Sequence, residues 1–129
     1  MTIAIICVIL AAFLPIIAAG IAKFGPTENA ASTPYDNNQP REWLAKQTGL
    51  RARANAAQAN TFESLPFFYI AIAIAMLLQA PQDRIDVLAI TYLLARVAYI
   101  ACYVMDWANL RTFVWLIGFA CTVALFFQI

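Results

Sequence analysis

Long apolar runs without charge limit most strongly what this chain can fold into. The ranges Thr2–Ala22, Leu65–Leu78, Val87–Ala95 and Thr112–Ile129 contain no charged side chain. A helix of about twenty apolar residues spans the ~30 Å hydrocarbon core of a bilayer. The chain is 64% hydrophobic and 12% charged, whereas soluble domains have about a quarter of their residues charged. We therefore predict an integral membrane protein.

The first apolar run could also be a cleaved signal peptide. It lacks the positively charged start of such peptides, and its first basic residue, Lys23, follows the run. We therefore expect a retained first span. The net charge of +1 gives no basic field for nucleic acid, and the chain has no histidine. Its three cysteines, Cys7, Cys102 and Cys121, lack metal-ligand spacing, so we expect small core residues and no metal site.

The predicted fold class is all-α, an integral membrane four-helix bundle with up-down topology. We expect a single domain over residues 1–129, with spans at about 2–23, 50–79, 84–107 and 111–128 and a cytoplasmic loop at 24–49. Within this loop, Pro40 suits the start of a short interfacial helix that has Trp43 at headgroup level. The second span is the longest, and its cytoplasmic half is polar. Pro66 is expected to kink this helix, and Asn109 to mark a turn.

Basic residues predict the orientation of the spans. The first connection and its flanks carry five basic residues, namely Lys23, Arg41, Lys46, Arg51 and Arg53. The third connection carries Arg111, the second only Arg84, and the chain ends none. The positive-inside rule then places the first and third connections in the cytoplasm. The termini are expected on the periplasmic side of a bacterial inner membrane.

Polar side chains occur at helical spacing inside the second and third spans. One face of the second span carries Arg53, Asn60, Glu63 and Phe67, and one face of the third carries Tyr92, Arg96, Tyr99 and Tyr103. Charged residues within a bilayer cost free energy and usually mark a site or an internal pair. The simplest alternative is an ion pair between Glu63 and Arg96 that only fixes helix register. The number of donors favours a small charged ligand, and glutathione, with two carboxylates, one amine and one thiol, fits this pattern.

The stretch from Arg53 through Asn60-Thr-Phe-Glu63-Ser-Leu-Pro66 to Phe67 resembles the second-helix signature of the MAPEG family. These are membrane-associated proteins in eicosanoid and glutathione metabolism. The third-helix pattern Arg96…Tyr99…Tyr103, with Arg111 near the start of the fourth helix, is similar to that family as well. The segment Tyr35-Asp-Asn-Asn-Gln-Pro-Arg41 resembles a loop of a bacterial branch. Length, spans and orientation agree with the resemblance over essentially the whole chain.

The resemblance implies a homotrimer with sites between subunits that open to the cytoplasm. It implies a glutathione transferase or peroxidase that acts on lipophilic electrophiles or lipid hydroperoxides, with glutathione as thiol substrate and membrane lipids around it. Arg111 would be catalytic, because a neighbouring cation favours the nucleophilic thiolate. The expected glutathione-binding residues are Arg53, Asn60, Glu63, Arg96, Tyr99 and Tyr103.

One position departs from the family pattern. Ala56 stands where many active members have an arginine, four residues before Asn60, whereas Arg53 keeps the earlier arginine position. This favours a second hypothesis, a non-catalytic lipid-binding or scaffold protein of the same fold. A small transport or accessory subunit is a third, although the repeated halves with broken helices typical of transporters are missing.

Overall fold

The computed structural model describes residues 1–27, 29 and 32–127. It contains five helices in this part of the chain: α1 (Ile3–Phe24), α2 (Pro40–Ala45), α3 (Gly49–Leu77), α4 (Gln82–Val104) and α5 (Ala108–Phe127). All but α2 are long and apolar enough to cross a bilayer. The described residues form no strand. The predicted all-α membrane bundle is therefore confirmed.

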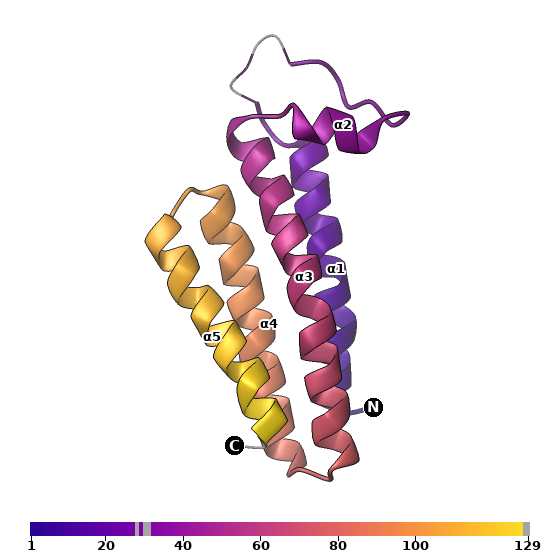
Figure 1. Cartoon of the computed structure of the whole chain (residues 1–129), viewed down its shortest axis with the longest axis vertical. Helices are drawn as coiled ribbons and strands as arrows, with labels where there is room; N and C mark the ends of the chain where they lie inside the picture. Colours follow the sequence, from indigo (N-terminus) through magenta and orange to yellow (C-terminus); the bar gives the residue numbers. More distant parts are fainter. Residues whose placement is uncertain (28, 30–31, 128–129) are drawn as a thin grey trace.

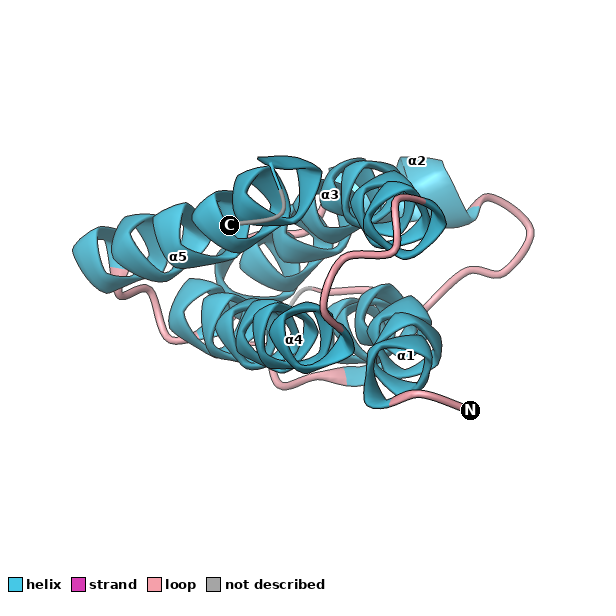
Figure 2. Ribbon diagram, turned by 90° about the horizontal axis from the view of Figure 1, so that it is seen from below, coloured by secondary structure: helices cyan, strands magenta, loops and turns pink. Residues whose placement is uncertain are grey.

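The four long helices run alternately up and down. Both termini lie at the end of the bundle that carries the α3–α4 turn, and the long connection with α2 lies at the other end, with the α4–α5 turn (Figure 1). Viewed from below, α1 and α5 occupy opposite corners, with α3 and α4 between them (Figure 2). The helices α3, α4 and α5 all contact one another, which makes them the walls of the cavity described below.

Small side chains allow α1 to pack closely on its neighbours. The buried residues of α1 recur at every third or fourth position and are mostly small: Ala4, Cys7, Ala11, Leu14, Pro15, Ala18 and Ala22. Such stripes bring helix backbones close together in membranes, where dispersion rather than the hydrophobic effect holds helices to each other. Two hydrogen bonds connect this helix to others: Tyr69 Oη donates to the Val8 carbonyl at 3.2 Å, and the Ala4 N–H donates to Asp86 Oδ1 at 2.8 Å.

Two short turns reverse the chain through residues with left-handed backbone. Gln79, two residues after the end of α3, has φ 55°, and Asp106, two residues after the end of α4, has φ 63°. After each of them, an N–H bonds back to a carbonyl five residues earlier, Ala80 to Ala75 and Trp107 to Cys102. The second reversal is complete before Asn109, which lies inside α5. The expectation that Asn109 marks a turn was therefore wrong, because Asp106 makes that reversal.

Aromatic and cationic side chains hold the long connection over α1 and α3. Tyr35 lies between the Lys23 ammonium, 4.7 Å from its ring, and the ring of Trp43 at 5.2 Å. Arg51 lies 5.5 Å from the Trp43 ring and donates from Nε to the Gly25 carbonyl at 2.8 Å. Trp43 is consequently buried among protein groups. These contacts fix the start of α3 and, with it, the depth of the polar residues further along that helix.

Candidate functional site

A cavity of about 260 Å³ lies between α3, α4 and α5. Its lining combines three charged or amide side chains, which are Asn60, Glu63 and Arg96, with hydroxyl and aromatic groups. The lining residues are Asn60, Glu63, Ser64, Phe67, Tyr92, Arg96, Trp115, Gly118, Phe119 and Thr122. All of them lie within helices that are long enough to span a membrane. A polar cavity at such a position is unusual enough to be a candidate binding site.

Arg96 is the most buried charged group of this cavity, with 2% of its surface exposed. Its Nη2 donates to Asn60 Oδ1 at 3.1 Å and to Thr61 Oγ1 at 2.9 Å. Its Nε is buried without a hydrogen-bond partner among the described residues. An ion pair with Glu63, the simplest alternative from the sequence, does not form. Arg96 therefore keeps hydrogen-bonding capacity and an uncompensated positive charge beside the cavity.

Most hydroxyl protons of the cavity are already donated within the protein. Ser64 Oγ donates to the Thr61 carbonyl at 2.9 Å, so the Tyr92 hydroxyl, 2.9 Å from Ser64 Oγ, must donate to Ser64. Thr122 donates to the Gly118 carbonyl at 3.1 Å. The remaining donors in the lining are Arg96, the amide of Asn60 and the indole N–H of Trp115, whereas Glu63 is an exposed carboxylate acceptor. A ligand in this cavity should therefore carry an acceptor or anion for Arg96 and a donor or cation for Glu63.

On α4, the rings of Tyr99 and Tyr103 lie between the guanidinium groups of Arg96 and Arg111. We call these four residues the tyrosine ladder. Arg96 Cζ lies 4.2 Å from the centre of the Tyr99 ring, and Arg111 Cζ lies 4.2 Å from that of Tyr103. The two rings meet edge to face with their centres 5.7 Å apart. This ladder leads from the buried cavity to the start of α5, and cation–π contacts of this kind stabilise the arginines where water is scarce.

Arg53 lies at the far end of this ladder. Its Nε donates to the carbonyl of Val104, the last residue of α4, at 3.2 Å. This bond satisfies one of the carbonyls that a helix leaves free at its C-terminus. It also joins the polar start of α3 to the turn before Arg111.

The structure thus divides the seven predicted site residues into two groups. Asn60, Glu63 and Arg96 line the cavity, whereas Tyr99, Tyr103, Arg111 and Arg53 lie along the ladder outside it. Because Arg96 belongs to both groups, the cavity and the ladder are continuous. Thr61 was missed as the main partner of Arg96, although it follows Asn60 directly in the signature.

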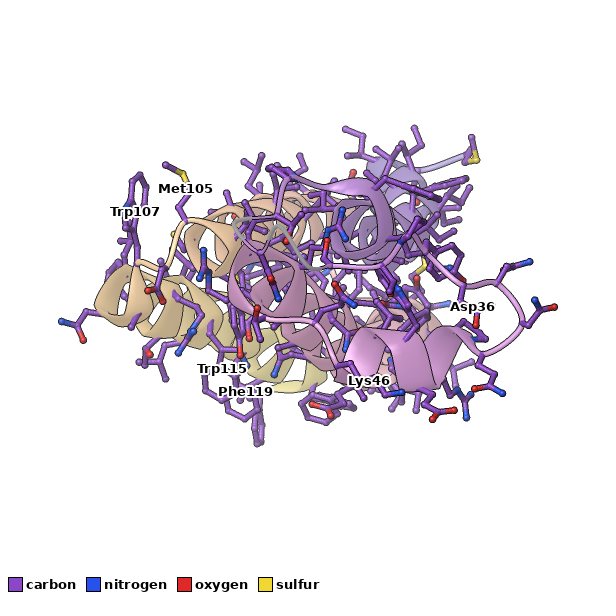
Figure 3. The ribbon with its side chains drawn as sticks, turned by 90° about the horizontal axis from the view of Figure 1, so that it is seen from above. Asp36, Lys46, Met105, Trp107, Trp115 and Phe119 are labelled. Carbon is purple, nitrogen blue, oxygen red and sulfur yellow. The ribbon has the colours of Figure 1, made fainter. Side chains whose placement is uncertain are left out.

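The part of the aromatic side that comes from α5 was also missed, whereas Phe67 lies on the α3 face that the sequence already placed with Asn60 and Glu63. Phe67 comes from α3, and Trp115 and Phe119 come from α5, where they point outward on the same side of the molecule (Figure 3). The fourth-helix spacing of Trp115, Phe119 and Thr122 places them on the face that also carries Arg111. That periodicity was available from the sequence, but it did not indicate which helix this face meets.

Comparison with known proteins gives one finding. The profile described as MAPEG family matches residues 3–129. No curated protein and no solved structure shows significant similarity to the chain. Because the match covers essentially the whole sequence, the chain belongs to the MAPEG family.

Proposed function

We propose that this protein is a membrane-bound glutathione transferase or peroxidase that activates a thiolate against lipophilic electrophiles or lipid hydroperoxides. Membership of the MAPEG family points to glutathione or eicosanoid metabolism and so supports this class of activity.

The single observation that carries the proposal is that Glu63 and Arg96 line one cavity and are not paired with each other. A buried charge without a counterion is costly, so a ligand that supplies opposite charges is favoured there. The γ-glutamyl end of glutathione has an ammonium group for Glu63 and a carboxylate for the guanidinium of Arg96. Asn60, whose Oδ1 is held by Arg96, retains its amide N–H groups for the peptide.

The rest of the tripeptide would follow the ladder toward Arg111. Tyr99 and Tyr103 lie between the cavity and Arg111, and Arg53 lies beside the end of α4, where it bonds to Val104, next to Tyr103 in the chain. In the reaction the glutathione thiol loses its proton to water, and the guanidinium of Arg111 stabilises the thiolate. The sulfur then forms a bond to the electrophilic carbon, and the leaving group departs with its bonding electron pair. With a hydroperoxide, the sulfur takes the terminal oxygen and releases an alcohol, and a second glutathione displaces water to give the disulfide.

The assembly belongs to the same proposal. A volume of about 260 Å³ is small for a tripeptide, since ligand pockets commonly measure ~300–1,000 Å³. A homotrimer, in which a neighbouring subunit covers the open side of each site, would supply the remaining surface. The basic residues of the long connection favour its placement in the cytoplasm and that of both termini in the periplasm of a bacterial inner membrane. Cysteine labelling of Asn38→Cys in intact cells tests this orientation, because all three native cysteines are buried.

One observation favours a second candidate, a lipid-binding or scaffold protein without chemistry. Arg111 lies against the Tyr103 ring and does not line the cavity. Ala56 also stands at the position where the resemblance places an arginine, so a carboxylate ligand has one cation fewer there. A lipid-binding protein would keep the cavity but would form no thiolate.

One experiment separates the two candidates. The full-length protein is purified in detergent, and glutathione binding is measured by calorimetry, thiolate formation by ultraviolet difference absorbance and conjugation with an aromatic halide. Glu63→Gln should weaken binding, because it removes the partner of the ammonium group. Arg111→Leu should leave binding largely intact but abolish the thiolate signal.

One control variant makes the result specific, and two outcomes would contradict the proposal. Glu42→Gln changes a carboxylate that forms an exposed ion pair with Lys46 at 3.5 Å and does not line the cavity, and it should change neither binding nor thiolate formation. If the parent protein binds no glutathione and forms no thiolate at millimolar concentrations, the enzyme proposal fails and the lipid-binding one remains. If glutathione binding is unchanged in Glu63→Gln and thiolate formation is unchanged in Arg111→Leu, these residues do not form the site.

A further inference from the structure

Two basic side chains and two aromatic rings form a connected cluster where α1 ends and α3 begins. The Lys23 ammonium lies 4.7 Å from the centre of the Tyr35 ring, which meets the Trp43 ring at 5.2 Å. The Arg51 guanidinium lies 5.5 Å from the Trp43 ring, and its Nε donates to the carbonyl of Gly25, two residues after Lys23, at 2.8 Å. We call Lys23, Tyr35, Trp43 and Arg51 the cation–aromatic cluster. Both of its cations are held against protein groups.

No carboxylate in the described part of the chain neutralises these two cations. The long connection has two described carboxylates, and both are engaged elsewhere: Asp36 accepts a backbone N–H two residues further on at 2.9 Å, and Glu42 pairs with Lys46 at 3.5 Å. Among the same residues, the Lys23 ammonium and the terminal amino groups of Arg51 find no hydrogen-bond acceptor. Both side chains are half-buried, so their donors still reach the outside. The cluster therefore suits a ligand with anionic oxygen atoms.

The cluster lies at the level where hydrocarbon gives way to headgroups. Helix α1 has 22 residues, which gives a length of about 33 Å and matches the ~30 Å of a hydrocarbon core. Lys23 and Phe24 lie in its last turn, and Phe24 keeps 74% of its surface exposed. Ile17 and Phe13 are exposed on the same face of α1, seven and eleven residues before Phe24. An apolar face of α1 therefore reaches from the bilayer to the position next to Lys23.

We propose that the cation–aromatic cluster binds the headgroup of an anionic phospholipid. The lipid phosphate accepts hydrogen bonds from the amino groups of Arg51 and the ammonium of Lys23, and an acyl chain lies along the face of α1 that ends at Phe24. Anionic lipids attract basic residues that lie just beyond a membrane span. A soluble phosphate also matches the cations, but it gains nothing from the exposed apolar face beside them. The combination of both features favours a lipid.

This inference goes beyond the proposed function and does not depend on it. The cavity lies between α3, α4 and α5, whereas α1 occupies the corner opposite α5 (Figure 2). Because Arg51 also ties the beginning of α3 to the end of α1, a headgroup bound to it would steady both helix ends. The expected consequence is that anionic phospholipid stabilises the folded protein.

The test measures lipid binding to the intact protein. The full-length protein in an uncharged detergent is titrated with phosphatidylglycerol, and the bound lipid is counted by native mass spectrometry. Phosphatidylglycerol should bind saturably and raise the thermal unfolding temperature. Added salt should weaken the binding, because it screens charges near the surface. Zwitterionic phosphatidylcholine with the same acyl chains should bind much more weakly.

Substitutions separate the cluster from the general positive charge of the connection. Lys23→Gln should weaken the apparent affinity for phosphatidylglycerol about fivefold, the factor expected for one basic residue near an anionic surface. Lys23→Arg keeps the cation and should keep the affinity. Arg41→Gln is the matched control, because it removes the same charge from an exposed position of the same connection outside the cluster. If Lys23→Gln does not fold, Phe24→Ser leaves both cations in place and should weaken lipid binding by removing the exposed ring.

Four results would overturn the inference. Equal binding of the two lipids would show that the cluster does not select an anionic headgroup. Equal losses in Lys23→Gln and Arg41→Gln would mean that net charge alone attracts the lipid. Displacement of the lipid by its deacylated headgroup, glycerophosphoglycerol, or by glutathione would make the cluster a site for soluble anions. A smaller oligomer in Lys23→Gln with unchanged lipid binding would make it a contact between copies of this chain. None of these outcomes depends on thiolate formation, so failure of the proposed function is recognised separately.

Discussion

Arg96 on α4 donates a hydrogen bond to Thr61 on α3 across 2.9 Å, and Glu63, two residues further along α3, takes no part in it. The hydroxyl satisfies one edge of the guanidinium without neutralising it. The charge of Arg96 therefore remains available, which would not be so if Glu63 were its partner. As a result, two charged side chains of opposite sign line the same cavity without neutralising each other.

Replacing Thr61 should destabilise the protein. Thr61→Val keeps the shape of the side chain but removes the acceptor of the buried Arg96 bond, at an expected cost of about 1–2 kcal/mol. The change is measured as a lower thermal unfolding temperature in detergent. Thr112→Val is the control, since the exposed Thr112 hydroxyl donates to the Ala108 carbonyl of its own helix and, among the described residues, to no other helix. Equal effects of the two substitutions would show that the Thr61–Arg96 bond adds no stability.

Filling part of the cavity should weaken ligand binding without preventing folding. A Cβ at Gly118 would meet Ala95, Arg96 and Tyr92 at the ordinary distances of 3.7–3.8 Å, and the rest of a leucine would extend into the cavity. Gly118→Leu should weaken glutathione binding roughly tenfold or more, which corresponds to about 1.4 kcal/mol. Gly20→Leu, where a Cβ meets nothing within 4 Å, serves as the control. Unchanged binding by Gly118→Leu in calorimetry would place glutathione elsewhere.

Restoring the family arginine should strengthen glutathione binding. Ala56 is half-buried and lies one turn before Asn60 on α3. Ala56→Arg adds a charge-assisted donor for a carboxylate, and a tightening of roughly tenfold in Kd is expected. Ala59→Arg adds the same charge at an exposed position of the same helix and should have little effect. If both variants bind glutathione equally tightly, the gain comes from net charge and not from the site.

Removing the Arg53 side chain should loosen the end of α4. Arg53→Met retains an apolar stem of similar length but loses the bond to the Val104 carbonyl, with an expected cost of about 1 kcal/mol. Hydrogen exchange of the amides around the α4–α5 turn should become faster. Arg41→Met, at an exposed position, should leave this exchange unchanged. Equal exchange in Arg53→Met and the parent would mean that this bond does not hold the turn.

Several elements could be predicted from the sequence because they depend on one helix at a time. Charge-free runs define the spans, since a charge within a bilayer is costly in any tertiary arrangement. The spacing of Asn60 and Glu63 on one helix, and of Arg96, Tyr99 and Tyr103 on another, sets which residues share a face. The turn before α5 was misplaced because both Asn109 and Asp106 suit a chain reversal, and only the backbone shows that Asp106 has the left-handed conformation.

Only the tertiary structure shows which residues of neighbouring helices contact each other. Periodicity fixes a residue's face but not the rotation or vertical register of the neighbouring helix, and a shift of one position along α3 changes the partner of a long arginine side chain. In the folded chain this register brings Arg96 to Thr61 and Asn60 and leaves Glu63 unpaired. The same packing brings Trp115 and Phe119 of α5 beside Phe67 of α3. The sequence by itself determined a membrane bundle with polar residues inside it, and the packing of α3, α4 and α5 decided that these residues line a cavity with one aromatic side.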